Sequence, residues 1–338
     1  MNLLDLVTPE KFSGCLVGQC LADALGSPVE GYPPETCQTY VDEILKKPEK
    51  NFFGRGRFPF GQYTDDSQLA RELMQSYVDT NGKFSPANYA KRIAAIFQEQ
   101  RIVGRGRATE EAAMRLAAGV DWQKAGTPAP AAGNGSAMRA APVGLLFFDN
   151  PKEMIQVACD QGIITHQNPL CSAGSVAIAG ATALVLQSKT IDKEAFLTQL
   201  SSWVGEVEST FASAIMELKN WVLLPPNKAV TFISRAGLDT TYSDKWQGIS
   251  PFVMGSVLWS LYSFLRTPED YWETVCTSIA VGGDVDTTGA MAGAISGAYL
   301  GLSHIPVSLT DRLNDQETWK LDELVALANE CYALKFRS

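Results

Sequence analysis

Small residues recur at intervals of four in three segments of the chain, and this pattern constrains the fold more than any other feature. In a helix, residues four apart lie on one face, so each series forms a groove that carries almost no side chain. Such a groove lets another helix approach closely, although glycine inside a helix costs about 1 kcal/mol relative to alanine. The three series are Gly14, Gly18, Ala22 and Gly26; Ala173, Ala177 and Ala181; and Gly289, Gly293, Gly297 and Gly301.

These series predict central, buried helices near residues 12–26, 172–187 and 287–302. Elsewhere the chain also has helical periodicity, as in Leu69, Leu73 and Tyr77, and no run alternates convincingly between apolar and polar residues as a strand would. With 338 residues, 46% of them hydrophobic, the chain can form one large core. No linker or internal repeat divides it. We therefore expect an all-α, compact helical bundle, with residues 1–338 as a single domain.

The charge balance argues against nucleic-acid binding. The formal net charge is −9, so the protein has no general electrostatic attraction for a phosphate backbone. An anionic small molecule would be opposed as well, unless backbone amides or cations offset the charge locally. We expect no nucleic-acid partner and a monomer.

Cysteine usage and the N-terminus point to a cytoplasmic protein. The seven cysteines have no paired spacing, which argues against a disulfide framework and for a reducing compartment. The N-terminus lacks a basic region followed by an apolar run and a cleavage site, so no signal peptide is expected. The apolar stretch 173–186 is shorter than a bilayer-spanning helix needs. We therefore expect no membrane association.

Two acidic clusters are the best candidates for chemistry. Thr64-Asp65-Asp66-Ser67 precedes a helix expected to begin near Gln68, and Gly282-Gly283-Asp284-Val285-Asp286-Thr287-Thr288 precedes the last glycine series. Either cluster alone could be a helix N-cap, since Asp, Ser and Thr are favoured there. Capping needs one such residue, however, whereas each cluster supplies two carboxylates and a hydroxyl. These hard oxygen ligands suit Mg²⁺ or Mn²⁺ and not zinc.

Five segments resemble, in order, the motifs of the ADP-ribosylglycohydrolases. They are GCLVGQCLADALGSPVEG, YTDDSQLA, GNGSAMR, ITHQNPL and GGDVDTTGAMAGAISGAYLGL. The matches run from about residue 12 to residue 306, and the pairing of TDDS with GGDVDTTGAMAGAISG is highly specific. The family usually reads TDDT where this chain has Ser67, so a hydroxyl is retained.

The resemblance implies an orthogonal all-helical bundle with a binuclear metal centre that holds two Mg²⁺ or Mn²⁺ ions. Asp286 would bridge the ions. The implied ligands are Thr64, Asp65, Asp66, Asp284, Asp286 and Thr287.

The resemblance also implies catalytic and substrate-binding residues. Glu30 would approach the metal centre and take part in catalysis, with Asp66 as the second candidate; an ordinary loop glutamate would instead be a solvated charge. Asp23 is interpreted as a structural hydrogen-bonding group. Glycines let backbone amides approach anionic oxygens, so the loop 133–136 could bind ADP-ribose, although Asn-Gly is also a common turn. The expected substrate-binding residues are Gly106, Gly133, Asn134, Gly135, Ser136 and His166.

The implied activity is hydrolysis of the glycosidic bond between ADP-ribose and an acceptor, on an ADP-ribosylated protein or a small ADP-ribosyl compound. In the arginine-specific type an aspartate stands two residues before the Gly-Asn pair, where this chain has Ala131. Glu30 matches the serine- and polymer-cleaving type. We therefore expect O-linked substrates, such as ADP-ribosylserine. The alternatives are an ADP-ribosylarginine hydrolase, a metal-dependent phosphohydrolase and a catalytically idle crystallin-like relative.

Overall fold

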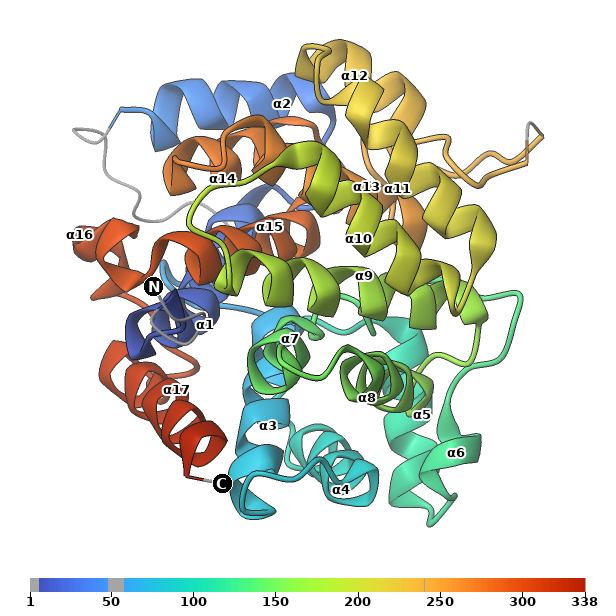
Figure 1. Ribbon diagram of the computed structural model, residues 1–338, viewed down its shortest axis with the longest axis vertical. Coiled ribbons are helices and arrows are strands. Elements are labelled where there is room, and N and C mark those ends of the chain that lie inside the picture. Colours follow the sequence, from blue (N-terminus) through green and yellow to red (C-terminus); the bar gives the residue numbers. More distant parts are fainter. Residues whose placement is uncertain (1–5, 48–57, 240, 338) are drawn as a thin grey trace.

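Helices built from small residues lie at the middle of the computed structural model, which describes residues 6–47, 58–239 and 241–337 (Figure 1). They are α1 (Pro9–Gly26), α9 (Pro169–Leu186) and α15 (Val285–Leu300). Their side chains are almost entirely buried. The three predicted central helices are thus confirmed. Only Gly301 falls outside, because α15 ends at Leu300 and Gly301 is its C-cap with a φ of 87°.

The other elements surround these three helices, and the described residues contain seventeen α-helices and no strand, as the all-α prediction requires. Single β-bridges, such as Thr127 with His166 and Ile249 with Gly283, join loops to one another. The surrounding elements are η2 (Ser27–Val29), α2 (Pro34–Tyr40), η3 (Val41–Leu45), α3 (Asp65–Asp79), α4 (Pro86–Gln98), α5 (Arg107–Ala117), α6 (Trp122–Ala125), α7 (Ala141–Phe147), α8 (Pro151–Ile163), α10 (Lys193–Gly205), α11 (Ser209–Trp221), α12 (Pro226–Ile233), α13 (Val253–Arg266), α14 (Tyr271–Ala280), η4 (Leu302–His304), α16 (Val307–Thr310) and α17 (Leu321–Phe336).

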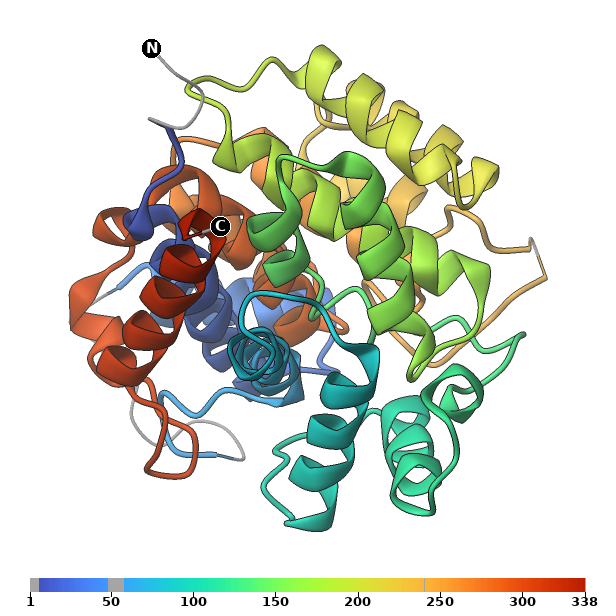
Figure 2. The same ribbon diagram turned by 60° about the horizontal axis from the view of Figure 1, so that its bottom comes forward.

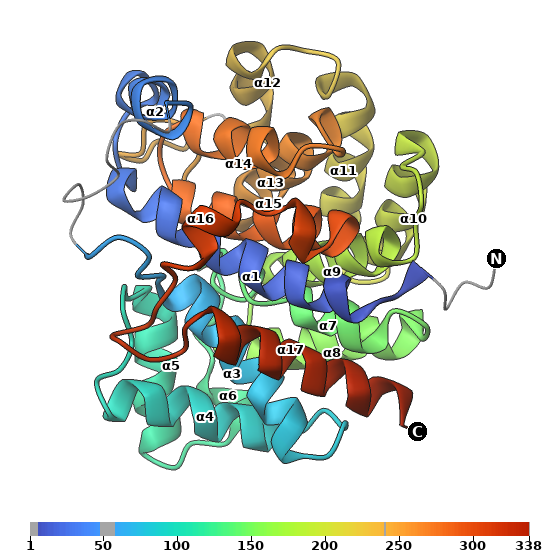
Figure 3. The same ribbon diagram turned by 90° about the vertical axis from the view of Figure 1, so that its left-hand side faces the viewer.

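The glycine faces of α1 and α15 pack directly against each other, and the two helices run side by side across the molecule (Figure 3). A Cβ atom added to Gly14 would lie 2.4 Å from the carbonyl oxygen of Gly297. At Gly293 it would lie 2.5 Å from the carbonyl oxygen of Gly18. Since Gly14 pairs with Gly297 and Gly18 with Gly293, the two helices are antiparallel.

This register carries on to the ends of both helices. A Cβ atom on Gly289 would lie 3.1 Å from the carbonyl oxygen of Ala22, and one on Gly26 would lie 2.6 Å from Cα of Asp286. The last turn of α1 is therefore in backbone contact with the first turn of α15. That contact brings the GSPVEG segment beside the second acidic cluster.

Helix α9 packs by the same principle against neighbours on several sides. A Cβ atom on Gly174 would lie 2.4 Å from Cγ2 of Val253 in α13, and one on Gly144 of α7 would lie 2.2 Å from the carbonyl oxygen of Ala179. The helix has 18 residues with a mean hydropathy of 1.7 and is 83% buried in the fold. By length and composition alone the whole helix could cross a membrane, so the expectation that the apolar stretch 173–186 is too short to do so is wrong. Its burial accounts for its apolar composition instead.

Helix α3 packs among α1, α4 and α17. Helix α17 packs against α1 and α3, and α3 is seen nearly end-on when the bottom of the molecule is turned forward (Figure 2). The N-terminal end of α3 carries the first acidic cluster, and α3 contacts both α1 and α15. All seven cysteines are free, in agreement with the expectation of no disulfide framework.

The backbone contact between α1 and α15 predicts that Gly293→Ala destabilises the protein. An alanine favours a helix intrinsically, but here its methyl group would meet Gly18 O at 2.5 Å and Ala22 Cβ at 2.6 Å. Overpacking of this kind costs about 1–3 kcal/mol, which urea denaturation of the two proteins would measure. Gly205→Ala in α10 is the matched control, because its methyl group would meet Ala212 Cβ at 3.5 Å and should leave stability unchanged or higher. Equal effects of both substitutions would contradict the close-packed register.

Candidate metal centre

Asp23 of α1 caps helix α3 from outside. Its carboxylate oxygens accept hydrogen bonds from the Thr64 amide, at 3.0 Å to each oxygen, and from the Ser67 amide at 3.1 Å. The hydroxyls of Thr64 and Ser67 donate to it as well, at 2.9 and 2.7 Å. The interpretation of Asp23 as a structural hydrogen-bonding group agrees with these contacts.

The cap also explains why α3 begins earlier than the sequence predicts. The sequence predicts that the first acidic cluster precedes a helix that begins near Gln68, but α3 begins at Asp65 with Thr64 as its N-cap. The Thr64 side chain makes no capping bond, because Asp23 satisfies the amides of the first turn from another helix. Asp65 and Asp66 consequently lie in the first turn, where carboxylates interact favourably with the helix dipole.

The second acidic cluster is held by a loop that only glycine can form. Gly283 has a φ of 91°, and a Cβ atom there would lie 2.0 Å from the carbonyl oxygen of Ile249. Its amide donates to Tyr32 O at 3.0 Å, and its carbonyl accepts from the Gly31 amide at 2.8 Å. The loop therefore joins the 31–32 segment to the N-terminus of α15, where Asp284 is the N-cap and Asp286 lies in the first turn.

Three carboxylates converge at this point. Oxygen atoms of Glu30, Asp284 and Asp286 lie within 4.8 Å of one another, with Glu30 exposed and both aspartates buried. Glu30 reaches the group because η2 turns the chain directly after Gly26, which contacts Asp286. The structure thus brings the predicted catalytic glutamate together with two of the predicted metal ligands.

The first acidic cluster interacts with the same group. Burial, together with the charges of Glu30 and Asp284, raises the pKa of Asp65 to about 7, although the Gly106 amide opposes this. Burial and the charges of Asp23, Asp65 and Asp284 raise the pKa of Asp66 well above its usual value. Burial also raises the pKa of Asp286, with Glu30, Asp66 and Asp284 adding to the effect. These charges repel one another in a place that water solvates poorly.

Such a donor set suits a divalent cation. Asp66 is 3% exposed, and its Oδ1 atom has no hydrogen-bond partner among the described residues. Hydroxyls stand beside the carboxylates in both clusters: Thr64 Oγ1 lies 3.1 Å from Asp66 Oδ2, and Thr287 donates to Asp284 Oδ1 at 3.2 Å. All the donors are oxygens, which Mg²⁺ and Mn²⁺ prefer. The six predicted ligands thus lie at the facing ends of α3 and α15.

Two of the predicted substrate-binding segments contact these carboxylates. The side-chain amide of Asn134 donates to Asp284 Oδ2 at 2.6 Å and to the oxygen of the Ser256 hydroxyl at 3.0 Å. The Gly106 amide donates to Asp65 Oδ2 at 3.4 Å. Asn134 therefore orients a metal-ligand candidate directly, a contact that the sequence did not indicate.

His166 lies against the glycines of the same loop. A Cβ atom on Gly135 would lie 2.7 Å from its Cε1 atom, and one on Gly133 would lie 3.6 Å from its Nε2 atom. Burial, with Arg139 nearby, lowers the pKa of His166 to about 3, so the ring is neutral near pH 7. Its Nδ1 atom pairs with the Thr165 hydroxyl at 2.8 Å.

Arg139, the last residue of the GNGSAMR motif, supports His166 through Thr165, a role that no local sequence pattern indicates. The Arg139 guanidinium is buried and donates to the Thr165 hydroxyl oxygen at 2.8 Å. The Thr165 hydroxyl group in turn pairs with Nδ1 of His166. His166 therefore presents its Nε2 atom on the side of Gly133.

Ser136 differs from the rest of the predicted substrate loop. Its hydroxyl is buried and donates to the carbonyl oxygen of Cys171 in α9 at 3.1 Å. The side chain therefore anchors the loop to the core, and a role in substrate binding stays a prediction for this residue.

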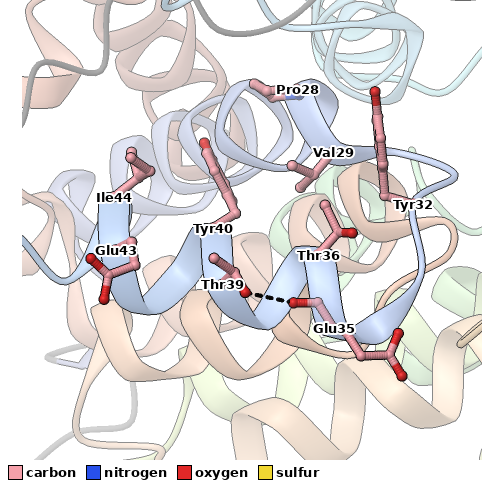
Figure 4. Close-up of a pocket in the computed structure, with 9 residues that line it drawn as sticks. All are labelled: Pro28, Val29, Tyr32, Glu35, Thr36, Thr39, Tyr40, Glu43 and Ile44. Atoms are coloured by element: carbon pink, nitrogen blue, oxygen red, sulfur yellow. Dashed lines mark hydrogen bonds between the residues drawn. The ribbon is translucent and has the colours of Figure 1, made fainter.

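A separate pocket lies next to Glu30 along the chain. It has a volume of about 520 Å³ and is lined by the η2–α2–η3 segment, with Tyr32 and Tyr40 as its aromatic residues (Figure 4). None of the four cluster aspartates lines it. This pocket is thus distinct from the carboxylate cluster.

Comparison with known proteins gives one consistent result. A model of the ADP-ribosylglycohydrolase family matches residues 5–337. The chain is 30% identical to ADP-ribosylhydrolase ARH3 of Gallus gallus, over 93% of this chain and 92% of the relative. It is 28% identical to ADP-ribosylhydrolase ARH3 of Homo sapiens, over 88% and 87%. A solved structure titled "ADP-ribosylglycohydrolase-related protein complex" superimposes with a TM-score of 0.73 at 26% identity, over 97% and 99% of the two chains.

The raised pKa values predict how the metal-free protein responds to pH. Ionisation of Asp65 destabilises the folded state, because its pKa of about 7 exceeds the unfolded value of about 3.9. This destabilisation is absent below about pH 4 and complete above about pH 7. In EDTA, Asp65→Asn should therefore raise the melting temperature by several degrees at pH 8 and much less at pH 5. Asp311→Asn, at an exposed aspartate, should have little effect at either pH. A stabilisation that does not depend on pH would contradict this account.

Proposed function

The chain belongs to the ADP-ribosylglycohydrolase family and is a hydrolase of glycosyl bonds, and from this premise we propose that it uses two Mg²⁺ or Mn²⁺ ions to release ADP-ribose from O-linked acceptors. The observation that carries the proposal is the convergence of Glu30, Asp284 and Asp286 within 4.8 Å, next to the buried Asp65 and Asp66.

The cations would be held by oxygen ligands from both clusters, with Asp286 as the shared ligand. When bound, such cations act as Lewis acids that orient ribose hydroxyls and lower the pKa of a water molecule. The proposed ligands are Thr64, Asp65, Asp66, Asp284, Asp286 and Thr287.

The proton transfer is assigned to Glu30, with Asp66 as the second candidate. Glu30 is the exposed member of the converging group, so its carboxylate can reach a water molecule or the departing acceptor oxygen. Glycoside hydrolysis proceeds through an oxocarbenium-like transition state, for which a positioned carboxylate accepts or donates one proton. Asp66 is buried, and its Oδ1 atom faces no donor among the described residues.

The substrate would lie along the glycine loops. Gly133, Gly135 and Gly106 let backbone amides approach diphosphate oxygens, which offsets the net charge of −9 locally. His166 is neutral, and its Nε2 atom would form one further hydrogen bond to the substrate without adding charge. The Ser136 hydroxyl secures this loop to α9.

We propose that the substrate is an ADP-ribosylated protein or a small ADP-ribosyl compound. The acidic chain is not expected to bind nucleic acid. We assign the protein to the cytoplasm as a monomer. Helix α9 requires no membrane, because it is packed in the fold.

The reaction and the role of Glu30 are tested together. With Mg²⁺ and an ADP-ribosylated serine peptide, the wild-type protein should release ADP-ribose, identified by mass, and EDTA should abolish this until Mg²⁺ or Mn²⁺ is restored. Glu30→Gln should lower kcat by about 10²–10⁴ and leave KM and ADP-ribose binding nearly unchanged, since only proton transfer is lost. Glu35→Gln in the neighbouring α2 is the matched control, at an exposed glutamate.

Four outcomes would contradict the proposal in different ways. Release of phosphate in place of ADP-ribose would identify a phosphohydrolase. Absence of any product with saturating cation would identify a catalytically idle relative. Full activity after cation removal, or an unchanged kcat in Glu30→Gln, would overturn the assigned mechanism.

Acceptor preference is assigned from Ala131. This residue is exposed, two positions before the Gly133-Asn134 pair that contacts Asp284. A guanidinium leaving group differs from an alkoxide in charge and proton demand, so an acid at this position should matter most for arginine-linked substrate. Ala131 supplies none.

The specificity constant, kcat/KM, should therefore be higher on serine-linked than on arginine-linked ADP-ribosyl peptides, by roughly 10²-fold if one acid group is decisive. Ala131→Asp should raise the value for arginine-linked peptide and leave that for serine-linked peptide nearly unchanged. Equal or faster release from arginine by the wild-type protein would show that Ala131 does not determine the preference.

A further inference from the structure

Gln68 has every hydrogen-bonding atom of its side chain in use, although it lies in the interior of α3. Its Oε1 atom accepts from the Val103 amide at 2.8 Å, and its Nε2 atom donates to the carbonyl oxygen of Arg101 at 2.9 Å. The second Nε2 proton goes to Asp315 Oδ1 at 2.7 Å. The side chain is fully buried, and this set of partners fits only one orientation of the amide.

The two bonds to Arg101 and Val103 hold an extended segment against the start of α3. Gln68 contacts the backbone on both sides of Ile102, as a neighbouring strand would. The same segment accepts the Asp65 amide at the carbonyl oxygen of Val103, at 2.7 Å. Residues 101–103 are thus tied to α3 at Asp65 by backbone and at Gln68 by side chain.

The segment then passes directly over the Asp65 carboxylate. Gly104 has a φ of 74°, and a Cβ atom there would lie 2.8 Å from Asp65 Oδ1. Two residues later the Gly106 amide donates to Asp65 Oδ2 at 3.4 Å. Any displacement of residues 101–103 would therefore move the atoms that orient this carboxylate.

Gln68 is itself anchored from the far side by Asp315. This aspartate is 3% exposed, and it accepts from Arg71 at 2.7 Å and from Gln62 at 3.2 Å in addition to Gln68. It begins a tight loop in which Gln316, Glu317 and Trp319 have positive φ values of 51°, 67° and 48°. Backbone in this region is costly for residues other than glycine, so the loop keeps Asp315 in one position.

We propose that Gln68 is a positioning residue that sets the orientation of Asp65 through the 101–106 segment and so controls the affinity for divalent cations. The inference rests on the proposed function, because it takes Asp65 as a cation ligand. Groups that orient a metal ligand commonly change affinity by 10–100-fold when they are removed.

The experiment measures Mn²⁺ binding alone, by calorimetric titration of the full-length protein without substrate. Gln68→Met keeps the length of the side chain but removes all three hydrogen bonds, and the dissociation constant for Mn²⁺ should rise about tenfold or more. If that variant does not fold, Gln68→Asn provides the same test, because its shorter amide cannot reach both Arg101 and Val103.

Two controls separate positioning from general loosening. Gln75→Met makes the same replacement two turns further along α3 and should bind Mn²⁺ like the wild-type protein. Asp315→Asn should lower the melting temperature, because the buried Arg71 loses the nearer of its two carboxylate partners and keeps only Glu72. The asparagine retains an oxygen that accepts from Gln68. The Mn²⁺ affinity of this variant should stay within about twofold of wild type, in contrast to the tenfold or greater loss expected for Gln68→Met.

Normal Mn²⁺ affinity in a folded Gln68 variant would overturn the inference and leave the proposed function intact. So would a loss of affinity that follows the melting temperature across all the variants. A wild-type protein that binds no Mn²⁺ would overturn the proposed function together with this inference.

Discussion

The backbone contact between α1 and α15 is the constraint on which the rest of the structure depends. Because Gly14, Gly18 and Gly293 have no side chains, the two helices approach until carbonyl oxygens lie where Cβ atoms would be. An approach this close admits one register. The register places the end of α1 on the beginning of α15, so the position of Asp286 relative to Asp23 and Glu30 is decided by packing far from any polar group.

From that contact the site is assembled by capping. Asp23, one turn before the end of α1, accepts the amides of Thr64 and Ser67 and so fixes where α3 begins. Asp284 occupies the N-cap position of α15, and its carboxylate is held by the side-chain amide of Asn134. The carboxylates of Asp65, Asp66 and Asp286 are buried beside one another as a result, and burial, together with repulsion from neighbouring carboxylates, raises their pKa values. A divalent cation would offset that repulsion, which is why the arrangement fits a hydrolase that needs one.

The surrounding loops supply orientation and hydrogen bonds without further charge. His166 is neutral and is held by Thr165, which in turn accepts a hydrogen bond from Arg139, while Gly106 and the 133–135 loop offer backbone amides. The cations and these neutral donors together would allow an acidic protein to bind the anionic ADP-ribose moiety. Gln68 and Asp315 extend this support to the opposite side of α3.

The sequence by itself determined the fold class, the three central helices and the residue types of the site. The interval of four between small residues is a local pattern, and motifs such as TDDS and GGDVDTT are contiguous, so both can be recognised without coordinates. The start of α3 could not be recognised in this way, because its cap is Asp23, 41 residues before Thr64. The bonds from Asn134 to Asp284, 150 residues away, and from Gln68 to Asp315, 247 residues away, likewise leave no local pattern. The tertiary structure alone decided which aspartate caps a helix and which converge with Glu30 in a candidate cation site, because those roles depend on distances between helix ends that the α1–α15 register sets.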